Sequence, residues 1–244
     1  SAACVRLQWV RYLAVKRNSA GVPADELVAR APCALPDPFW DTPTVDVAAS
    51  TAQPLWIEID VPRDAVAGEY TGTLTLRWDN GSVNLPLHLT VWDFELPATR
   101  HQQVTNWFTF PGAGYHVEHD TAWELAAKYA KIMVAHRQTC FKAELGWIKT
   151  TFDPQHGYQC DFRFLDRWAE TFFAAGMERM ELLQAGTISA SVDNPAARSG
   201  PANLAVEVKV PGLQLTAEEK FRAVLEQLDR HVREKNWTNR VMIH

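Results

Sequence analysis

The chain has 244 residues, a formal net charge of −5 and 47% hydrophobic residues. This balance suits a globular protein of one large or two ordinary domains, and it offers neither a nucleic-acid surface nor a polybasic membrane patch. No apolar run approaches the roughly 18 residues that a membrane helix needs, so we expect no membrane span.

The N-terminal part of the chain shows strand patterns and no convincing helix. Residues 4–15 predict one long strand, residues 18–43 contain repeated prolines and predict loops, and residues 44–48 predict a short strand. Three further runs alternate between apolar and polar residues: 55–61, 73–78 and 83–91. A period of two places one face of each strand in a core.

The ends of these runs carry turn signals. Asn80-Gly81, between the last two runs, is typical of a tight hairpin. Pro97 ends the last strand. We therefore interpret residues 1–98 as a β-sandwich domain.

From residue 101 onward, strands and helices alternate, which is typical of a parallel α/β domain. Strands are expected at residues 104–108, 139–145, 178–183 and 239–244, and helices at residues 121–136, 162–175 and from 216 onward. Thr121 with Glu124, and Thr216 with Glu219, form capping-box patterns. About 30 residues separate the third strand from the last helix, with a strand-like segment at 206–210, and such long connections are often functional.

Each expected helix carries an apolar stripe that would face a sheet. The stripes are Leu125, Tyr129, Ile132 and Met133 on the first helix, Leu165, Trp168, Phe172 and Phe173 on the second, and Phe221, Val224, Leu225, Leu228 and Val232 on the third. Gly176 is expected to cap the end of the second helix.

The unit spacing after residue 98 matches that of a (β/α)8 barrel, which takes about 250 residues and eight strands. Four such strands are expected here. The predicted fold is therefore multidomain β plus α/β, with an N-terminal β-sandwich at 1–98 and an incomplete TIM-type barrel at 99–244. We expect the rest of the barrel to come from natural chain beyond residue 244. A complete, open four-stranded α/β sheet is the alternative.

Residues 54–62, 67–74 and 87–97 resemble the N-terminal sandwich of glycoside hydrolase family 123. Trp123-Glu124-Leu125, Tyr129 and His136-Arg137 look like the first helix of that family's barrel. The resemblance implies a retaining β-N-acetylgalactosaminidase-like enzyme and a glycan as its partner.

The family resemblance also implies a mechanism. An Asp-Glu pair follows the fourth barrel strand, where the Glu is the general acid and the Asp supports attack by the substrate's own 2-acetamido group, an exception to the two-carboxylate scheme. In this sequence the pair is expected beyond His244. The catalytic residues therefore stay unknown, and residues 1–244 alone are expected to be inactive.

Active sites of such barrels lie at the carboxyl ends of the strands. This rule selects five candidate substrate-binding residues: Asn106, Trp107, Glu144, Gln184 and His244. Each has a structural alternative. Trp107 would stack on a sugar or pack under a loop, and Glu144 would bind a hydroxyl or pair with Lys142 or Lys149.

No metal or cofactor is expected. His116, Glu118, His119 and Asp120 are nearly consecutive and lack the spacing of a metal site. Four cysteines without a CxxC pattern favour free thiols over two disulfides. The sequence names no compartment, although a secreted, periplasmic or cell-surface location would suit a glycan hydrolase.

Two rival functions remain open at this point. The ten tryptophans would also suit a non-catalytic carbohydrate-binding or scaffold protein that uses the sandwich. In the other rival, the enzyme's carboxylates lie within the chain, for example at Glu144 and Glu181.

Overall fold

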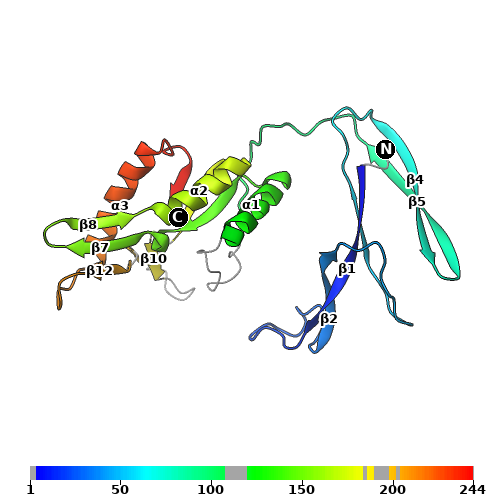
Figure 1. Cartoon of the computed structure of the whole chain (residues 1–244), viewed down its shortest axis with the longest axis horizontal. Coiled ribbons are helices and arrows are strands. Elements are labelled where there is room, and N and C mark those ends of the chain that lie inside the picture. Colours follow the sequence, from blue (N-terminus) through cyan, green and yellow to red (C-terminus); the bar gives the residue numbers. More distant parts are fainter. Residues whose placement is uncertain (1–3, 108–119, 184–185, 190–197, 202–203, 244) are drawn as a thin grey trace. The chain divides into compact units, whose positions relative to one another are not determined.

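The computed structural model describes residues 4–107, 120–183, 186–189, 198–201 and 204–243. The chain forms two compact units, Ser1–Leu96 and Pro97–His244, and Figure 1 shows the strands of the first and the mixed helices and strands of the second.

The first sheet of unit 1 has the order β2-β1-β3 and is antiparallel. Its strands are β1 (Val5–Val15), β2 (Cys33–Trp40) and β3 (Leu55–Ile59). Leu7 lies beside Ile57 on one face. Arg6 and Glu58 lie beside each other on the opposite face, with their charged groups 2.6 Å apart. Residues 55–59 thus alternate as predicted, although Trp56 shares the side of Glu58 and its ring lies 5.5 Å from that of Phe39 between centroids.

The second sheet is the hairpin of β4 (Gly68–Trp78) and β5 (Gly81–Val91), as the Asn80-Gly81 signal predicts. Leu74 lies beside Leu85 on one face. On the other, the Thr90 hydroxyl donates to the Glu69 carboxylate at 2.8 Å. The hairpin therefore has the two-sided character that a sandwich requires.

Packing of these sheets into a sandwich is not established by the structure. Among the described residues of unit 1, Val10 and Leu74 are the buried hydrophobic side chains, while Leu7 and Leu85 are exposed by 48% and 40%. The sandwich therefore stays a prediction.

Two expectations for unit 1 were wrong. Residues 44–48 form no strand, and the segment expected to be loop contains β2. Pro36 and Pro38 lie within β2, which is an edge strand bonded only to β1. A proline is tolerated there because its missing N–H faces away from the partner strand.

Unit 2 is built on a parallel sheet of β6 (Cys140–Glu144), β9 (Arg179–Leu183) and β13 (Val241–Ile243), in the order β13-β9-β6. A parallel bridge from Thr105 to Cys140 adds the preceding segment at the β6 edge. The parallel strands are therefore neighbours in the sheet in the order in which they follow one another along the chain, as in a (β/α)8 barrel. The described strands do not establish a barrel, so the barrel remains a proposal.

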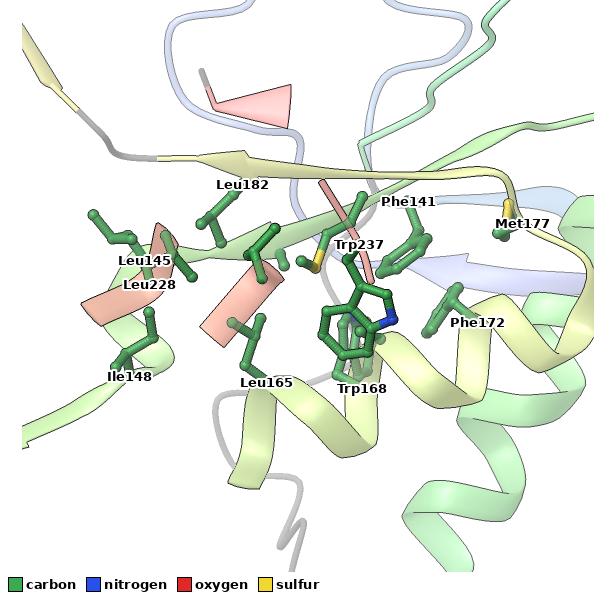
Figure 2. Packing of buried hydrophobic residues seen from close by; sticks show 14 of the residues in the cluster. Phe141, Leu145, Ile148, Leu165, Trp168, Phe172, Met177, Leu182, Leu228 and Trp237 are labelled. Atoms are coloured by element: carbon green, nitrogen blue, oxygen red, sulfur yellow. The ribbon is translucent and has the colours of Figure 1, made fainter. Parts of the chain in front are cut away.

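Helices α1 (Asp120–Ala135), α2 (Arg163–Ala175) and α3 (Ala217–Glu234) belong to this unit. The core is rich in aromatic rings: Phe172 lies 4.8 Å from Phe141 and 4.6 Å from Trp168 between ring centroids. Figure 2 shows these rings packed with Trp237 between α2 and the strands. The predicted stripes of α2 and α3 are confirmed, since Leu165, Trp168, Phe172, Val224, Leu228 and Val232 are buried and Phe173, Phe221 and Leu225 pack against the core.

The predicted stripe of α1 was right in part, since Met133 packs against the core and Leu125 and Tyr129 are half-buried. Ile132 is 56% exposed, whereas Ala126, Ala130 and Trp123 are buried. The small side chains allow α1 to approach its neighbour closely, and the Trp123 ring packs 5.4 Å from that of Phe164 on α2. The capping box at Thr121 was also misplaced, because the helix already begins at Asp120.

Additional strands lie outside the parallel sheet. A second sheet has the order β12-β7-β8, and β10 pairs with β11. The bounds of these strands are β7 (Lys149–Asp153), β8 (Gly157–Asp161), β10 (Gly186–Ser189), β11 (Arg198–Pro201) and β12 (Val206–Val208). The strand-like segment at 206–210 is therefore confirmed, while the β7–β8 hairpin was missed although Pro154 and Gly157 provide a turn signal.

The capping box of α3 generates a stability prediction. The Thr216 hydroxyl accepts from the Glu219 backbone N–H at 3.2 Å, and the Glu219 carboxylate accepts from the Thr216 N–H at 2.8 Å. Thr216→Ala should lower the free energy of unfolding by about 1 kcal/mol, measured by urea denaturation with circular dichroism. Thr216→Ser keeps the hydroxyl and should stay close to wild type. Equal stabilities of Thr216→Ala and wild type would contradict this assignment.

A second prediction concerns acid stability at the start of α2. The Arg163 guanidinium and backbone N–H donate to Asp161 and lower the pKa of that carboxyl to about 2 from 3.8. A depressed pKa means stability that is present above pH 4 and is lost as the pH falls through 2. Between pH 4 and pH 2, the Tm of wild type should fall more steeply than that of Asp161→Asn, with Arg163→Gln intermediate. Parallel slopes in all three proteins would refute the assignment.

Candidate functional site

The site candidate is the face of the parallel sheet opposite the helices. In the register, Lys142, Glu181 and Met242 lie side by side on neighbouring strands. Their neighbours Phe141 and Met180 belong to the hydrophobic core. The alternation of β6 and β9 therefore sends apolar residues toward the helices and charged residues to the opposite face, which we call the polar face.

Glu181 is the most buried charged residue on the polar face, with 8% exposure. Its Oε2 accepts hydrogen bonds from Trp107 Nε1 at 2.9 Å and from Thr105 Oγ1 at 3.1 Å. Trp107 is itself 56% exposed. The polar face thus combines a buried carboxylate with an exposed aromatic ring whose indole N–H is hydrogen-bonded to that carboxylate.

Lys142 and Glu144 form an ion pair on the same face. The Lys142 ammonium lies 2.8 Å from Glu144 Oε1, with side-chain exposures of 15% and 28%. The Lys142 partner considered for Glu144 from the sequence is therefore confirmed as a contact. A pair that is this shielded from solvent is held more firmly than most surface ion pairs, and its remaining oxygen and ammonium protons suit sugar hydroxyls.

Cys140 is the first residue of β6 and lies on the polar face. It is 1% exposed, and burial is the main cause that raises the pKa of its thiol, with the Thr139 hydroxyl acting in the opposite direction and the Glu181 charge adding to the increase. All four cysteines are free thiols, but only Cys140 is buried. The sheet is therefore dry at this level.

The structure places three of the five candidate residues. Trp107 and Glu144 lie on the polar face, as expected for a sugar site. The Asn106 amide donates to the side-chain oxygen Oε1 of Gln138 at 3.4 Å. Gln184 and His244 lie outside the described residues. A substrate-binding role for any of the five stays a prediction.

Sequence reasoning missed the pairing of Glu181 with Trp107. Glu181 was considered only as a carboxylate for an internal enzyme mechanism, and no motif links positions 74 residues apart. Alternation in residues 178–183 was the available signal, because it puts Glu181 on the face away from Met180 and Leu182.

No catalytic pair is assigned here. The one adjacent Asp-Glu pair of the sequence, Asp25-Glu26, lies in an exposed turn of unit 1 and follows no parallel strand. It therefore lacks the placement that the family resemblance implies for the general acid.

Within the described ranges, no group of three His, Cys, Asp or Glu side chains is arranged to hold a metal ion. Of the four residues weighed as metal ligands, only Asp120 is described, and its carboxylate lies 3.2 Å from Arg167. The helices that the structure describes are all too short or too polar to cross a membrane.

Fold and site together define a class: a β unit followed by a parallel α/β unit with a polar, aromatic sheet face. Residues 1–78 match the family profile of the glycoside hydrolase 123 N-terminal domain. The resemblance to family 123 noted in the sequence is thus confirmed for residues 1–78 by the model of that family's N-terminal domain. A comparison with curated proteins finds no match.

A solved structure supports the fold. It is described as a structural analysis of glycolipid glycan hydrolysis by a family 123 glycoside hydrolase from Clostridium perfringens, and it matches with a TM-score of 0.72 at 14% identity. The match covers 100% of this chain and 46% of that chain. At this identity the likeness shows a shared fold, and the chain spans less than half the length of that protein.

The buried Cys140 thiol provides a test of whether water is excluded from the sheet at the candidate site. Because a thiolate is the reactive form and each unit of raised pKa reduces it about tenfold, Cys140 should alkylate at least several-fold more slowly than the half-buried Cys33. Iodoacetamide labelling at pH 8 with peptide mass spectrometry measures both rates. In denaturant the two rates should converge. Equal rates in the folded protein would show that solvent reaches the sheet below Glu181.

Proposed function

We propose that the protein is a glycoside hydrolase acting on β-linked N-acetylhexosamine, N-acetylgalactosamine in the first place, and that the polar face of unit 2 forms part of its sugar site. The observation that carries this proposal is Trp107, an exposed ring held by its N–H on buried Glu181 beside the Lys142–Glu144 pair. Sugar recognition needs this combination, an apolar platform for the C–H face and nearby acceptors and donors for the hydroxyls.

The position of these groups supports the proposal. Glu144 ends β6, and Trp107 follows the Thr105–Cys140 bridge, so both lie toward the carboxyl side of the parallel strands. In a (β/α)8 barrel that side carries the active site. We propose accordingly that unit 2 contributes the first strands of such a barrel, with the sandwich of unit 1 before it.

The proposed reaction is substrate-assisted hydrolysis with retention. The substrate's 2-acetamido oxygen would attack the anomeric carbon while a general acid protonates the leaving oxygen. In this scheme the residues of the polar face bind and orient the sugar, and the stacked ring helps to exclude water. The match to the N-terminal domain and the shared fold support the family scheme, while the general acid remains unassigned.

The sugar site is tested by binding. We expect methyl β-N-acetylgalactosaminide to bind the chain, detected by saturation-transfer NMR, and Trp107→Ala to weaken binding at least about tenfold because the stacking surface is lost. Trp78→Ala is the matched control, since Trp78 is 58% exposed and lies in unit 1.

The control also separates the rival function. Binding that survives Trp107→Ala but is lost in Trp78→Ala would place the sugar on unit 1 and favour the non-catalytic carbohydrate-binding protein. Unchanged binding in Trp107→Ala would remove the polar face as the sugar site.

A further inference from the structure

Glu181 is a charged residue at a buried position of the sheet, where its desolvation must be offset by favourable contacts. It is the third residue of β9 and is 8% exposed, and its neighbours Met180 and Leu182 are fully buried on the other face. Removing a carboxylate from water is unfavourable unless hydrogen bonds replace the lost hydration. An apolar side chain here would stabilise the sheet more simply.

The hydrogen bonds of Glu181 lead to a single segment. Among the described residues, both donors reach the same oxygen, Oε2, and they are the Thr105 hydroxyl and the Trp107 indole N–H. Neither donor is charged. Lys142 lies beside Glu181 in the register, but its ammonium contacts Glu144. Glu181 therefore serves to hold residues 105 and 107, and the neighbouring cation serves another carboxylate.

The segment that Glu181 holds is also anchored before residue 107, where Val104 bonds to Thr139 and Cys140 and the Asn106 amide donates to Gln138. Within the described residues its strand pairing is the single bridge of Thr105 to Cys140, and Trp107 lies beyond that bridge with over half of its surface exposed. An exposed indole has two rotatable bonds and samples several rotamers. A hydrogen bond from its N–H to a buried carboxylate is charge-assisted and directional, so it selects one ring orientation.

We propose that Glu181 is a positioning residue: its carboxylate fixes the indole of Trp107, with the Thr105 hydroxyl as a second tether, so that the ring is pre-set as a sugar platform. The sugar role rests on the proposed function, whereas the tether itself can be measured without a ligand. Pre-setting the ring removes the entropy loss that ordering it would add to binding.

The tether is tested first in the free protein. The indole 15N–1H resonance of Trp107 is assigned by its absence in Trp107→Phe. In Glu181→Gln, which preserves the side-chain shape, this resonance should move upfield and its hydrogen exchange should accelerate about tenfold, because the charged acceptor is gone. Glu170→Gln is the matched control: Glu170 is a carboxylate on α2 that pairs with Lys235, so the Trp107 signal should stay in place.

The coupling to sugar is tested by a double-mutant cycle. Titration with methyl β-N-acetylgalactosaminide should show Glu181→Gln and Trp107→Phe each weakening binding about three- to tenfold. The double variant should bind no more weakly than Trp107→Phe alone, since that variant has already lost the N–H. Glu181→Asp keeps the charge but shortens the reach, so it should fall between wild type and Glu181→Gln and provides a second variant should Glu181→Gln not fold.

The outcomes separate the two levels of the proposal. A Trp107 resonance that is unchanged in folded Glu181→Gln overturns the tether. Fully additive effects on binding overturn positioning through Trp107, because they show that the residues act independently. If the resonance shifts but Trp107→Phe and Trp107→Ala both bind the sugar as wild type does, the tether stands and the proposed sugar site is overturned.

Discussion

The two-faced character of the parallel strands governs unit 2. Parallel strands covered on both sides are usually apolar throughout, but β6 and β9 alternate. Phe141 and Met180 enter the helix-covered core, and Lys142 and Glu181 stand on the opposite face. Shielded charges need partners, so this alternation obliges the polar face to contain an ion pair and a hydrogen-bonded carboxylate. A rigid aromatic core behind the same strands fixes these groups in place.

Much of this fold could be predicted from the sequence because the decisive signals are local. The Thr216–Glu219 cap and the stripe of α3 depend on residues a few positions apart, and both are confirmed. The failures occurred where tertiary context decides. On α1, Ala126 and Ala130 face the core because the neighbouring helix α2 lies close and leaves room only for small side chains. The sequence pattern gives more weight to large apolar residues and therefore selects Ile132.

The candidate site was predictable only in part for the same reason. The strand-end rule selects Trp107 and Glu144 without knowledge of their contacts. The partner of Trp107 depends on which strands are neighbours and on their register, which brings Glu181 within 2.9 Å of a residue 74 positions earlier. No local pattern encodes that distance, although alternation along β9 does indicate the face on which Glu181 lies.

The exposed tryptophans illustrate why context matters more than residue type. In unit 1, the ring of Trp92 stacks on Phe94 at 5.7 Å between centroids, and a Cβ at Gly81 would lie within 2.9 Å of the Trp78 ring, so both rings have apolar or backbone neighbours that account for them. Trp107 differs because its indole N–H is hydrogen-bonded to the buried carboxylate of Glu181. Burying that carboxylate has an unfavourable free energy of desolvation. A packing role alone would be served better by an apolar residue at position 181, which is why the Glu181–Trp107 pair favours recognition over stability.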